Sequence, residues 1–450
     1  MSALARFFNH KKIVIAGYDR VSTSLTQELE NEGIKIIYED KEEKIFKDFK
    51  NAESNEKVVI YTPAIPKDSK ILNFFINHNY SVYKRSEVLG IISKNVETIA
   101  ISGTHGKTTV SSMTSHIFAT AGKDFAAFVG GISINTGSNL TLPKEGKNIE
   151  TFIVEADEFD RSLLQLSPEI AVITAIDEDH LDIYADKNDL LETFQKFAEQ
   201  INKSGKLLIK KGLSIRTENI DADCFTYSRE EKADFYAEKI SCSNIKSIFD
   251  LITPEGSIKE IELGMPGKVN VENAVAASAL AYLSGIKAKD IKEALKSYKG
   301  VKRRFEYLIK TEKNIYIDDY AHHPQEISAL LNSVRNIHQG KKITVIFQPH
   351  LYSRTKDFAE GFAQSLSIAD KVILLPIYPA REKPIEGVSS TIIFNHITAP
   401  KIMINKNELE GLLKVTNSDI FISVGAGDIG EMTDEIKKII LEKTSNKFKT

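Results

Sequence analysis

The run Ser102-Gly103-Thr104-His105-Gly106-Lys107-Thr108-Thr109 has the residue types that bind nucleotide phosphates. Glycines at 103 and 106 let the backbone curl around a phosphate, and Lys107 can reach the oxygens of the β- and γ-phosphates. The hydroxyl of Thr108 or Thr109 suits a magnesium ion. Ile101 stands where the ordinary phosphate loop has its first glycine, and a tight turn with an incidental lysine is the alternative. The strand, loop and helix context favours the phosphate site.

Acidic residues follow two further strand-like runs. Glu155 ends the first run, 151–155, and is the candidate second magnesium ligand, with Asp157 and Ser162 just beyond it. The second run, 170–174, leads into a cluster over 177–182 in which His180 can bind metal or orient a substrate. A solvated acidic loop and a hydrogen-bonded structural histidine are the alternatives. We favour a site because both clusters follow strands close to the glycine loop.

Polar strand ends recur in the last third of the chain. The strand 315–317 leads into Asp318-Asp319-Tyr320-Ala321-His322-His323-Pro324, and Pro324 is suited to open a helix. A zinc site is a less favoured alternative here, because adjacent histidines point in different directions and no third ligand has a familiar spacing. The strand 343–347 leads into a run containing His350 and Arg354, whose guanidinium suits a carboxylate or a phosphate. Binding of ATP and an amino acid fits these residues better.

Strand-like apolar runs alternate with amphipathic helices along most of the chain, which predicts an α/β fold of parallel sheets covered by helices. We expect three consecutive units, over residues 1–95, 96–300 and 301–450. The first should hold buried strands at 12–17 and 57–61 with a helix at 25–32 between them. Shorter alternating runs over 224–263 predict an antiparallel annex to the second unit.

Composition narrows the class of protein. The 450 residues carry 59 Lys+Arg against 62 Asp+Glu, so no excess charge favours nucleic acid. No apolar run approaches the roughly 20 residues of a membrane helix, and the start of the chain lacks the apolar core of an export signal. The two cysteines, Cys224 and Cys242, form no Cys-x-x-Cys pair and suit a reducing compartment. We therefore expect a cytoplasmic protein with neither nucleic acid nor membrane as its partner.

Together these motifs resemble the Mur ligases of peptidoglycan synthesis. The resemblance rests on runs in the family's order from about residue 10 to residue 430, namely 102–109, Glu155-Ala156-Asp157-Glu158, Asp179-His180-Leu181-Asp182, 301–306, 318–324, Gln348-Pro349-His350 with Arg354-Thr355, Tyr378-Pro379-Ala380-Arg381-Glu382 and Gly425-Ala426-Gly427-Asp428. It implies three domains: a Rossmann-like domain for a UDP-sugar, a central phosphate-loop ATPase and a Rossmann-like C-terminal domain that brings the amino acid.

The resemblance also assigns residue roles. Catalysis falls to Lys107, Glu155, His180, His350 and Arg354, and the magnesium ligands are Thr108, Glu155 and His180. ATP contacts are implied for Gly103, Thr104, His105, Gly106, Lys107, Thr108, Thr109, Asn273, Arg304 and Asp319. Substrate contacts are implied for Asp19, Thr62, Asp157, Ser162, Tyr320, His350 and Arg354, the last three forming an alanine pocket.

Three departures from the family pattern weaken single assignments. Val269-Asn270 stands where the family commonly has His-Asn, and Leu351 stands where it often has arginine. Family members open with a strand and a glycine loop that cradles the UDP diphosphate, whereas Ser2-Ala3-Leu4-Ala5-Arg6 here reads as the helix after that loop. We favour a start codon assigned too far downstream as the explanation, with a real truncation as the alternative. A chain that truly lacks that strand and loop should bind the UDP-sugar poorly.

The expected activity is the joining of L-alanine to the carboxylate of UDP-N-acetylmuramate with ATP and Mg²⁺, by a monomer or homodimer. The segment 348–354 resembles the alanine-adding branch of the family and argues against a related enzyme that adds a tripeptide. The other rival is a nucleotide-binding protein without catalysis.

Overall fold

The computed structural model describes residues 1–51, 53, 56–177, 184, 186–243, 246–380 and 382–446. Its residues form two compact units, which are described separately. The first unit holds 1–239, 249–261 and 272–298, and the second holds 240–248, 262–271 and 299–450. Both are α/β in construction, as the sequence predicts, and none of the described helices is long and apolar enough to cross a membrane.

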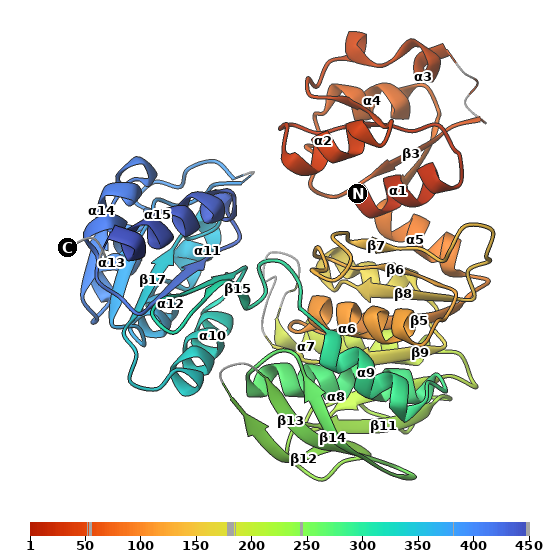
Figure 1. Cartoon of the computed structure of the whole chain (residues 1–450). Helices are drawn as coiled ribbons and strands as arrows, with labels where there is room; N and C mark the ends of the chain where they lie inside the picture. The colour runs from red at the N-terminus through yellow and green to blue at the C-terminus, as the bar shows by residue number, and fades with distance from the viewer. Residues whose placement is uncertain are drawn as a thin grey trace. The chain divides into compact units, whose positions relative to one another are not determined.

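The first 93 residues fold as short helices around two small parallel sheets, β1–β2 and β3–β4 (Figure 1). The elements are α1 (Ser2–His10), β1 (Ala16–Tyr18), α2 (Ser24–Asn31), β2 (Lys35–Ile37), η1 (Glu42–Lys44), α3 (Lys47–Asn51), β3 (Val58–Tyr61), α4 (Lys70–Asn77), β4 (Ser81–Lys84) and α5 (Arg85–Ser93). Thr23 caps α2 through the backbone N–H of Thr26, and Gly33 ends it with a φ of 88°.

The predicted buried strand at 12–17 is wrong over most of its length. Helix α1 ends at His10 and the chain turns at Lys12, whose φ is 62°, so pairing begins only at Ala16. Ile13 and Val14 are exposed by 51% and 75%. A strand within 57–61, the helix at 25–32 and the helix at the start of the chain are present as predicted. The strand is not buried as expected, since Val58 is exposed and the other residues of β3 are only partly buried.

A ten-stranded sheet forms the centre of the first unit among the described residues, with strand order β14-β13-β12-β11-β10-β9-β5-β8-β6-β7. Its strands are β5 (Glu97–Ser102), β6 (Phe125–Phe128), β7 (Leu140–Thr141), β8 (Thr151–Ala156), β9 (Ile170–Ile173), β10 (Lys206–Lys210), β11 (Asp223–Ser228), β12 (Phe235–Cys242), β13 (Ser247–Thr253) and β14 (Gly256–Leu263). The helical elements are α6 (Lys107–Thr120), η3 (Phe159–Gln165), α7 (Lys187–Glu199), α8 (Lys268–Leu283) and α9 (Ala288–Ser297). Strand β5 pairs in parallel with β8 and β9, so the carboxyl ends of these three strands meet at one edge.

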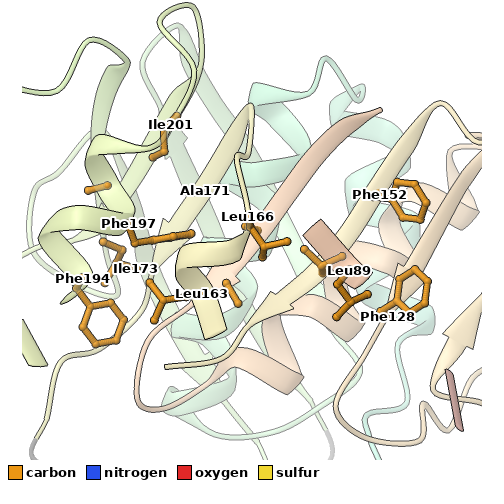
Figure 2. Close-up of a cluster of buried hydrophobic side chains, with 14 of the residues drawn as sticks. Leu89, Phe128, Phe152, Leu163, Leu166, Ala171, Ile173, Phe194, Phe197 and Ile201 are labelled. Atoms are coloured by element: carbon orange, nitrogen blue, oxygen red, sulfur yellow. The ribbon is translucent and has the colours of Figure 1, made fainter. Parts of the chain in front are cut away.

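Alternate residues of the central strands point to opposite faces of the sheet. Figure 2 shows one face, where Phe194 and Phe197 of α7 and Leu163 of η3 cover Ala171 and Ile173 of β9. Phe7 of α1 joins the same cluster through ring contacts with Phe128 and Phe152 at 5.5 and 6.1 Å. Helices α6, α8 and α9 lie along the other face (Figure 1). The sheet is thus covered on both sides, and the loops that follow its strands at the carboxyl edge start from buried, packed strand ends.

The predicted antiparallel annex is in part wrong. Strands β10, β11 and β12 pair in parallel and continue the central sheet. Only two residues join β13 to β14, and a connection that short requires an antiparallel hairpin.

The second unit has a six-stranded sheet in the order β15-β16-β20-β17-β18-β19, parallel except at β15. Its strands are β15 (Glu306–Lys310), β16 (Ile315–Asp319), β17 (Ile343–Phe347), β18 (Lys371–Leu374), β19 (Lys401–Met403) and β20 (Ile420–Val424). The helical elements are α10 (Pro324–Ile337), α11 (Tyr352–Asp357), α12 (Ala359–Leu366), α13 (Thr391–His396), η4 (Lys406–Glu408), α14 (Leu409–Val415), η5 (Asp428–Met432) and α15 (Thr433–Asn446). Pro324 opens α10 as predicted.

Candidate active site

The loop between β5 and α6 requires both of its glycines. Gly103 and Gly106 have φ of 128° and 83°, a region that other residues rarely adopt. A Cβ on Gly103 would overlap the hydroxyl of Thr174, and one on Gly106 would lie 3.0 Å from Oδ1 of Asn273. The loop is therefore closely packed, and Asn273 of α8 lies directly against it. The strand continues through Ile101, which is fully buried, so the first glycine of the ordinary pattern has no place here.

The end of β9 holds the loop backbone in place. Thr174 donates a hydrogen bond of 2.5 Å to the carbonyl of His105, and the N–H of Thr104 donates to the carbonyl of Ala175 at 3.0 Å. The N–H of Asp177 donates to Oγ1 of Thr104 at 3.1 Å, and Oδ2 of Asp177 lies 3.6 Å from Nε2 of His105. These bonds pre-form the loop, so little order has to be imposed when an anion binds.

Lys107 is held between the loop and the acidic turn after β8. Its Nζ donates to the carbonyl of Gly103 at 2.7 Å and lies 2.9 and 2.7 Å from the two carboxylate oxygens of Glu158. Burial pulls the pKa of Lys107 down, but the charges of Glu158 and Asp157 outweigh it and raise the pKa above its usual value. The lysine therefore meets any phosphate as a cation.

Glu155 and Thr108 lie side by side, as predicted for a magnesium pair. Oγ1 of Thr108 is 3.2 Å from Oε2 of Glu155, whose Oε1 accepts from Ser111 at 2.8 Å and from the N–H of Gly130 at 2.5 Å. Sequence reasoning missed Ser111 and Gly130. Ser111 follows Thr108 by three residues, so helical periodicity already puts both on one face. Gly130 comes from another strand's end and leaves no signal in the sequence.

Hydroxyl and carboxylate oxygens fit Mg²⁺, which needs one or two protein ligands and keeps several waters. Over the part of the chain that the structure describes, no group of three or more His, Cys, Asp or Glu is arranged to hold a metal ion. The third predicted ligand, His180, lies outside the described residues, as does Arg381.

The predicted sugar contacts lie on several elements of the first unit. Asp157 follows β8 and accepts from the N–H of Phe159 at 3.3 Å, and Ser162 is partly buried in η3. Asp19 follows β1 and Thr62 follows β3, two strands of different small sheets. Thr109 is partly exposed in the first turn of α6.

In the second unit, arginine and aromatic side chains gather where β16 ends. The guanidinium groups of Arg303 and Arg304 lie 5.2 and 5.1 Å from the ring centre of Tyr320. His322 is 5.4 Å from the Tyr320 ring and 6.3 Å from the His350 ring, and His350 stacks on Tyr378 at 5.9 Å. The predicted residues Arg304, Tyr320 and His350 thus belong to one cluster, and His322 and Tyr378 join them.

Arg303 and the two aspartates at the end of β16 are held in place by ion pairs and hydrogen bonds. Arg303 binds Asp318, which is fully buried, at 2.9 Å, and donates to the carbonyl of Gly425 at 2.5 Å. Asp319 accepts from the N–H groups of Phe305 and Ala321 at 2.6 and 2.7 Å. Burial raises the pKa of Asp319 to about 6, against the pull of Arg304.

The segment after β17 brings His350 and Arg354 to the same cluster. His350 pairs with Tyr378 through an isolated parallel β-bridge of the backbone. Leu351, with a φ of 67°, then turns the chain into α11, which carries Arg354. Burial lowers the pKa of His322, and the charge of Arg354 acts in the same direction. The histidines of the zinc alternative have separate partners: Nδ1 of His322 bonds the Tyr320 carbonyl at 3.0 Å, and the ring of His323 caps α10.

Comparison with known proteins bears on this arrangement. Residues 1–97, 101–281 and 303–427 match the profiles of the Mur ligase family catalytic domain, the Mur ligase middle domain and the Mur ligase glutamate ligase domain. A UDP-N-acetylmuramate--L-alanine ligase from Christiangramia forsetii is 44% identical over 98% of this chain and 96% of its own length. The chain belongs to the Mur ligase family.

Solved Mur ligases share the fold. A UDP-N-acetylmuramate-alanine ligase from Thermotoga maritima is 25% identical, covers 99% of this chain and 97% of its own, and has a TM-score of 0.80. A murein peptide ligase from Psychrobacter arcticus, at 19% identity, covers 98% and 96% with a TM-score of 0.68 and supports the fold alone. A relative from Parabacteroides distasonis, also a UDP-N-acetylmuramate--L-alanine ligase, is 45% identical over 98% of this chain and 95% of its own length. The expected three-domain Mur ligase architecture is confirmed.

Proposed function

We propose that this Mur ligase joins L-alanine to the lactyl carboxylate of UDP-N-acetylmuramate, with ATP converted to ADP and phosphate. The observation that carries the proposal is the pre-formed loop around Gly103 and Gly106, with Lys107 charged beside it and Thr108 paired with Glu155. The named activity of relatives that are 44% and 45% identical over 98% of this chain supports the choice of substrates. We also propose that the protein acts in the cytoplasm.

In the first step, a carboxylate oxygen of the sugar attacks the γ-phosphorus and ADP leaves, which gives an acyl phosphate. Negative charge moves onto the oxygen between the β- and γ-phosphates as the bond breaks. Lys107 and the loop N–H groups stabilise that charge. Thr108 and Glu155 would hold Mg²⁺, and the ion would supply further positive charge to the phosphates.

In the second step, the amine of alanine attacks the acyl carbon, phosphate leaves and one proton is lost from nitrogen. The amine must be neutral, because an ammonium group has no lone pair. The planar guanidinium of Arg354 suits the alanine carboxylate, because it can donate two parallel hydrogen bonds. Tyr320 and His350, whose rings both lie near that of His322, are the proposed neighbours of the alanine side chain. Asn273 and Arg304 with Asp319 are the proposed nucleotide contacts outside the loop.

The nearest rival adds a tripeptide to the same sugar. We would supply ATP, UDP-N-acetylmuramate and either L-alanine or L-alanyl-γ-D-glutamyl-meso-diaminopimelate, and measure released phosphate. Release with alanine and little release with the tripeptide is the expected result. The reverse preference would reassign the chain to the tripeptide branch, and ATP binding without sugar-dependent ADP would favour a protein without catalysis.

A further inference from the structure

The phosphate-loop lysine has a buried counter-ion to which the proposed mechanism gives no role. Both carboxylate oxygens of Glu158 lie within 2.9 Å of Nζ of Lys107. Glu158 is 1% exposed, whereas Lys107 retains 15% exposure of its side chain. A buried carboxylate is costly unless it is paired, so the ion pair with Lys107 stabilises the charge of Glu158.

The backbone at Glu158 is fixed by its own contacts. Its carbonyl oxygen accepts from the hydroxyl of Tyr184 at 2.6 Å and from the N–H of Arg161 at 2.9 Å. Asp160 and Arg161 both have a φ of 53°, and a left-handed conformation at two consecutive residues other than glycine is energetically unfavourable. The turn is therefore held in an unfavourable conformation.

Ion pairs on two sides hold this turn. Arg161 binds both oxygens of Asp189 at 2.8 Å and donates to Thr193 at 2.6 Å. Asp160 binds Lys84 at 2.7 Å. Strain persists where the surroundings over-determine it, and such turns occur where a side chain has to be placed accurately. The backbone of Glu158 is fixed together with this turn, because its carbonyl accepts from the N–H of Arg161.

Glu158 and a nucleotide phosphate would bind the same ammonium group of Lys107. Both are oxygen anions. The ammonium of Lys107 already donates to the carbonyl of Gly103 and to both carboxylate oxygens of Glu158. When phosphate enters the loop, either Lys107 turns toward it and gives up its bonds to Glu158, or the two anions share one cation and repel each other. Both outcomes reduce the affinity for nucleotide.

We propose that Glu158 is a positioning residue that substitutes for nucleotide phosphate in the empty loop, keeps Lys107 in place, and competes with the nucleotide so that product leaves. This inference rests on the proposed nucleotide site. It predicts that neutralising Glu158 strengthens nucleotide binding although it removes a buried ion pair.

The test is Glu158→Gln in the full chain, with titration of ADP in excess Mg²⁺ by calorimetry and a thermal melt. We expect the Kd for ADP to fall about tenfold while Tm falls, because the variant frees Lys107 for phosphate and removes a buried ion pair. The matched control is Glu169→Gln, which removes a carboxylate bonded to the Thr98 N–H and to Asn202 at the other edge of the same sheet. It should lower Tm and leave the Kd unchanged.

An unchanged or higher Kd in Glu158→Gln would overturn the inference, because a purely structural or metal-binding glutamate gives that result. If this variant does not fold, Glu158→Asp withdraws the charge by one methylene, and a Kd about threefold lower is then expected. An unchanged or higher Kd for Glu158→Asp overturns the inference equally. Failure of the unmodified chain to bind ADP would count against the proposed function instead.

Discussion

Lys107 serves two purposes at the scale of single residues. It is the cation beside the phosphate loop, and it neutralises Glu158, which is 1% exposed. Loss of one member of a buried ion pair leaves the other member charged and unpaired, which destabilises a protein by about 3 kcal/mol or more. Catalytic and structural effects of changing Lys107 can therefore be separated by changing Glu158 as well.

Lys107→Ala should abolish alanine-dependent phosphate release and lower Tm, because it removes the cation for both the phosphate and Glu158. The double variant Lys107→Ala/Glu158→Gln removes both charges and should recover most of the lost Tm with no recovery of activity. Phosphate release and thermal melts on the same preparations check this. Turnover in either variant near that of the unmodified chain would refute the role of Lys107.

Asp319 provides a pH-dependent prediction, because burial raises its pKa to about 6. Its ionised form should therefore dominate only above that pH. Because Asp319 is a proposed nucleotide contact in its ionised form, kcat/KM for ATP should rise as pH passes through about 6. A raised folded-state pKa also means that the protonated carboxyl favours the fold at low pH, a contribution lost as pH rises through about 6. Asp319→Asn should remove this limb of the pH–rate profile and lower kcat/KM about tenfold or more. A limb that persists in the variant belongs to another group.

The spacing of residue types was enough to predict that Thr108 lies beside Glu155, because Glu155 is near the end of β8 and Thr108 lies just beyond the neighbouring parallel strand β5. It could not predict that Glu158 rather than Asp157 pairs with Lys107. Glu158 lies next to the left-handed turn at Asp160 and Arg161, which the sequence signals only weakly, because aspartate adopts this conformation occasionally and arginine rarely.

At the scale of elements, the step from β5 into α6 is the critical connection. Gly103 must adopt a φ of 128° while packed against Thr174 and the backbone of Ala175. Gly122, which ends α6, has a φ of 68° but open space around the position of a Cβ. Comparing variants of the two glycines therefore distinguishes the effect of backbone strain alone from that of strain together with close packing.

Gly103→Ala should destabilise the fold by about 2 kcal/mol or more, because strain and overlap add, and should abolish nucleotide binding. Gly122→Ala should cost about 1 kcal/mol from strain alone and retain nucleotide binding. Urea unfolding and ADP titration of both variants measure these effects. Equal destabilisation, or normal ADP binding by Gly103→Ala, would contradict the packing account.

The continuous apolar strands were predictable from the sequence, because β5, β8 and β9 are buried on both faces. The run at 12–17 looks the same in sequence, but Ile13 and Val14 are exposed and pairing begins only at Ala16, since local hydrophobicity does not report whether a neighbouring strand is available. For the same reason the pairing of β10, β11 and β12 in parallel escaped prediction.

At the scale of the whole molecule, the sequence implied the three-domain Mur ligase architecture through motifs spread over most of its length, and the comparisons confirm it. The order of strands within each sheet did not follow from the sequence, because pairing between distant segments depends on tertiary packing. The near balance of 59 basic and 62 acidic residues agrees with small-molecule substrates rather than a polyanion.

The most direct test of the central claim is one reaction with the full chain, ATP, Mg²⁺, UDP-N-acetylmuramate and L-alanine, in which ADP and the sugar product are measured together. The account predicts one ADP for each UDP-N-acetylmuramoyl-L-alanine formed, and no product when any component is omitted. ADP formation that does not depend on the sugar and alanine, or no ADP at all, would contradict it.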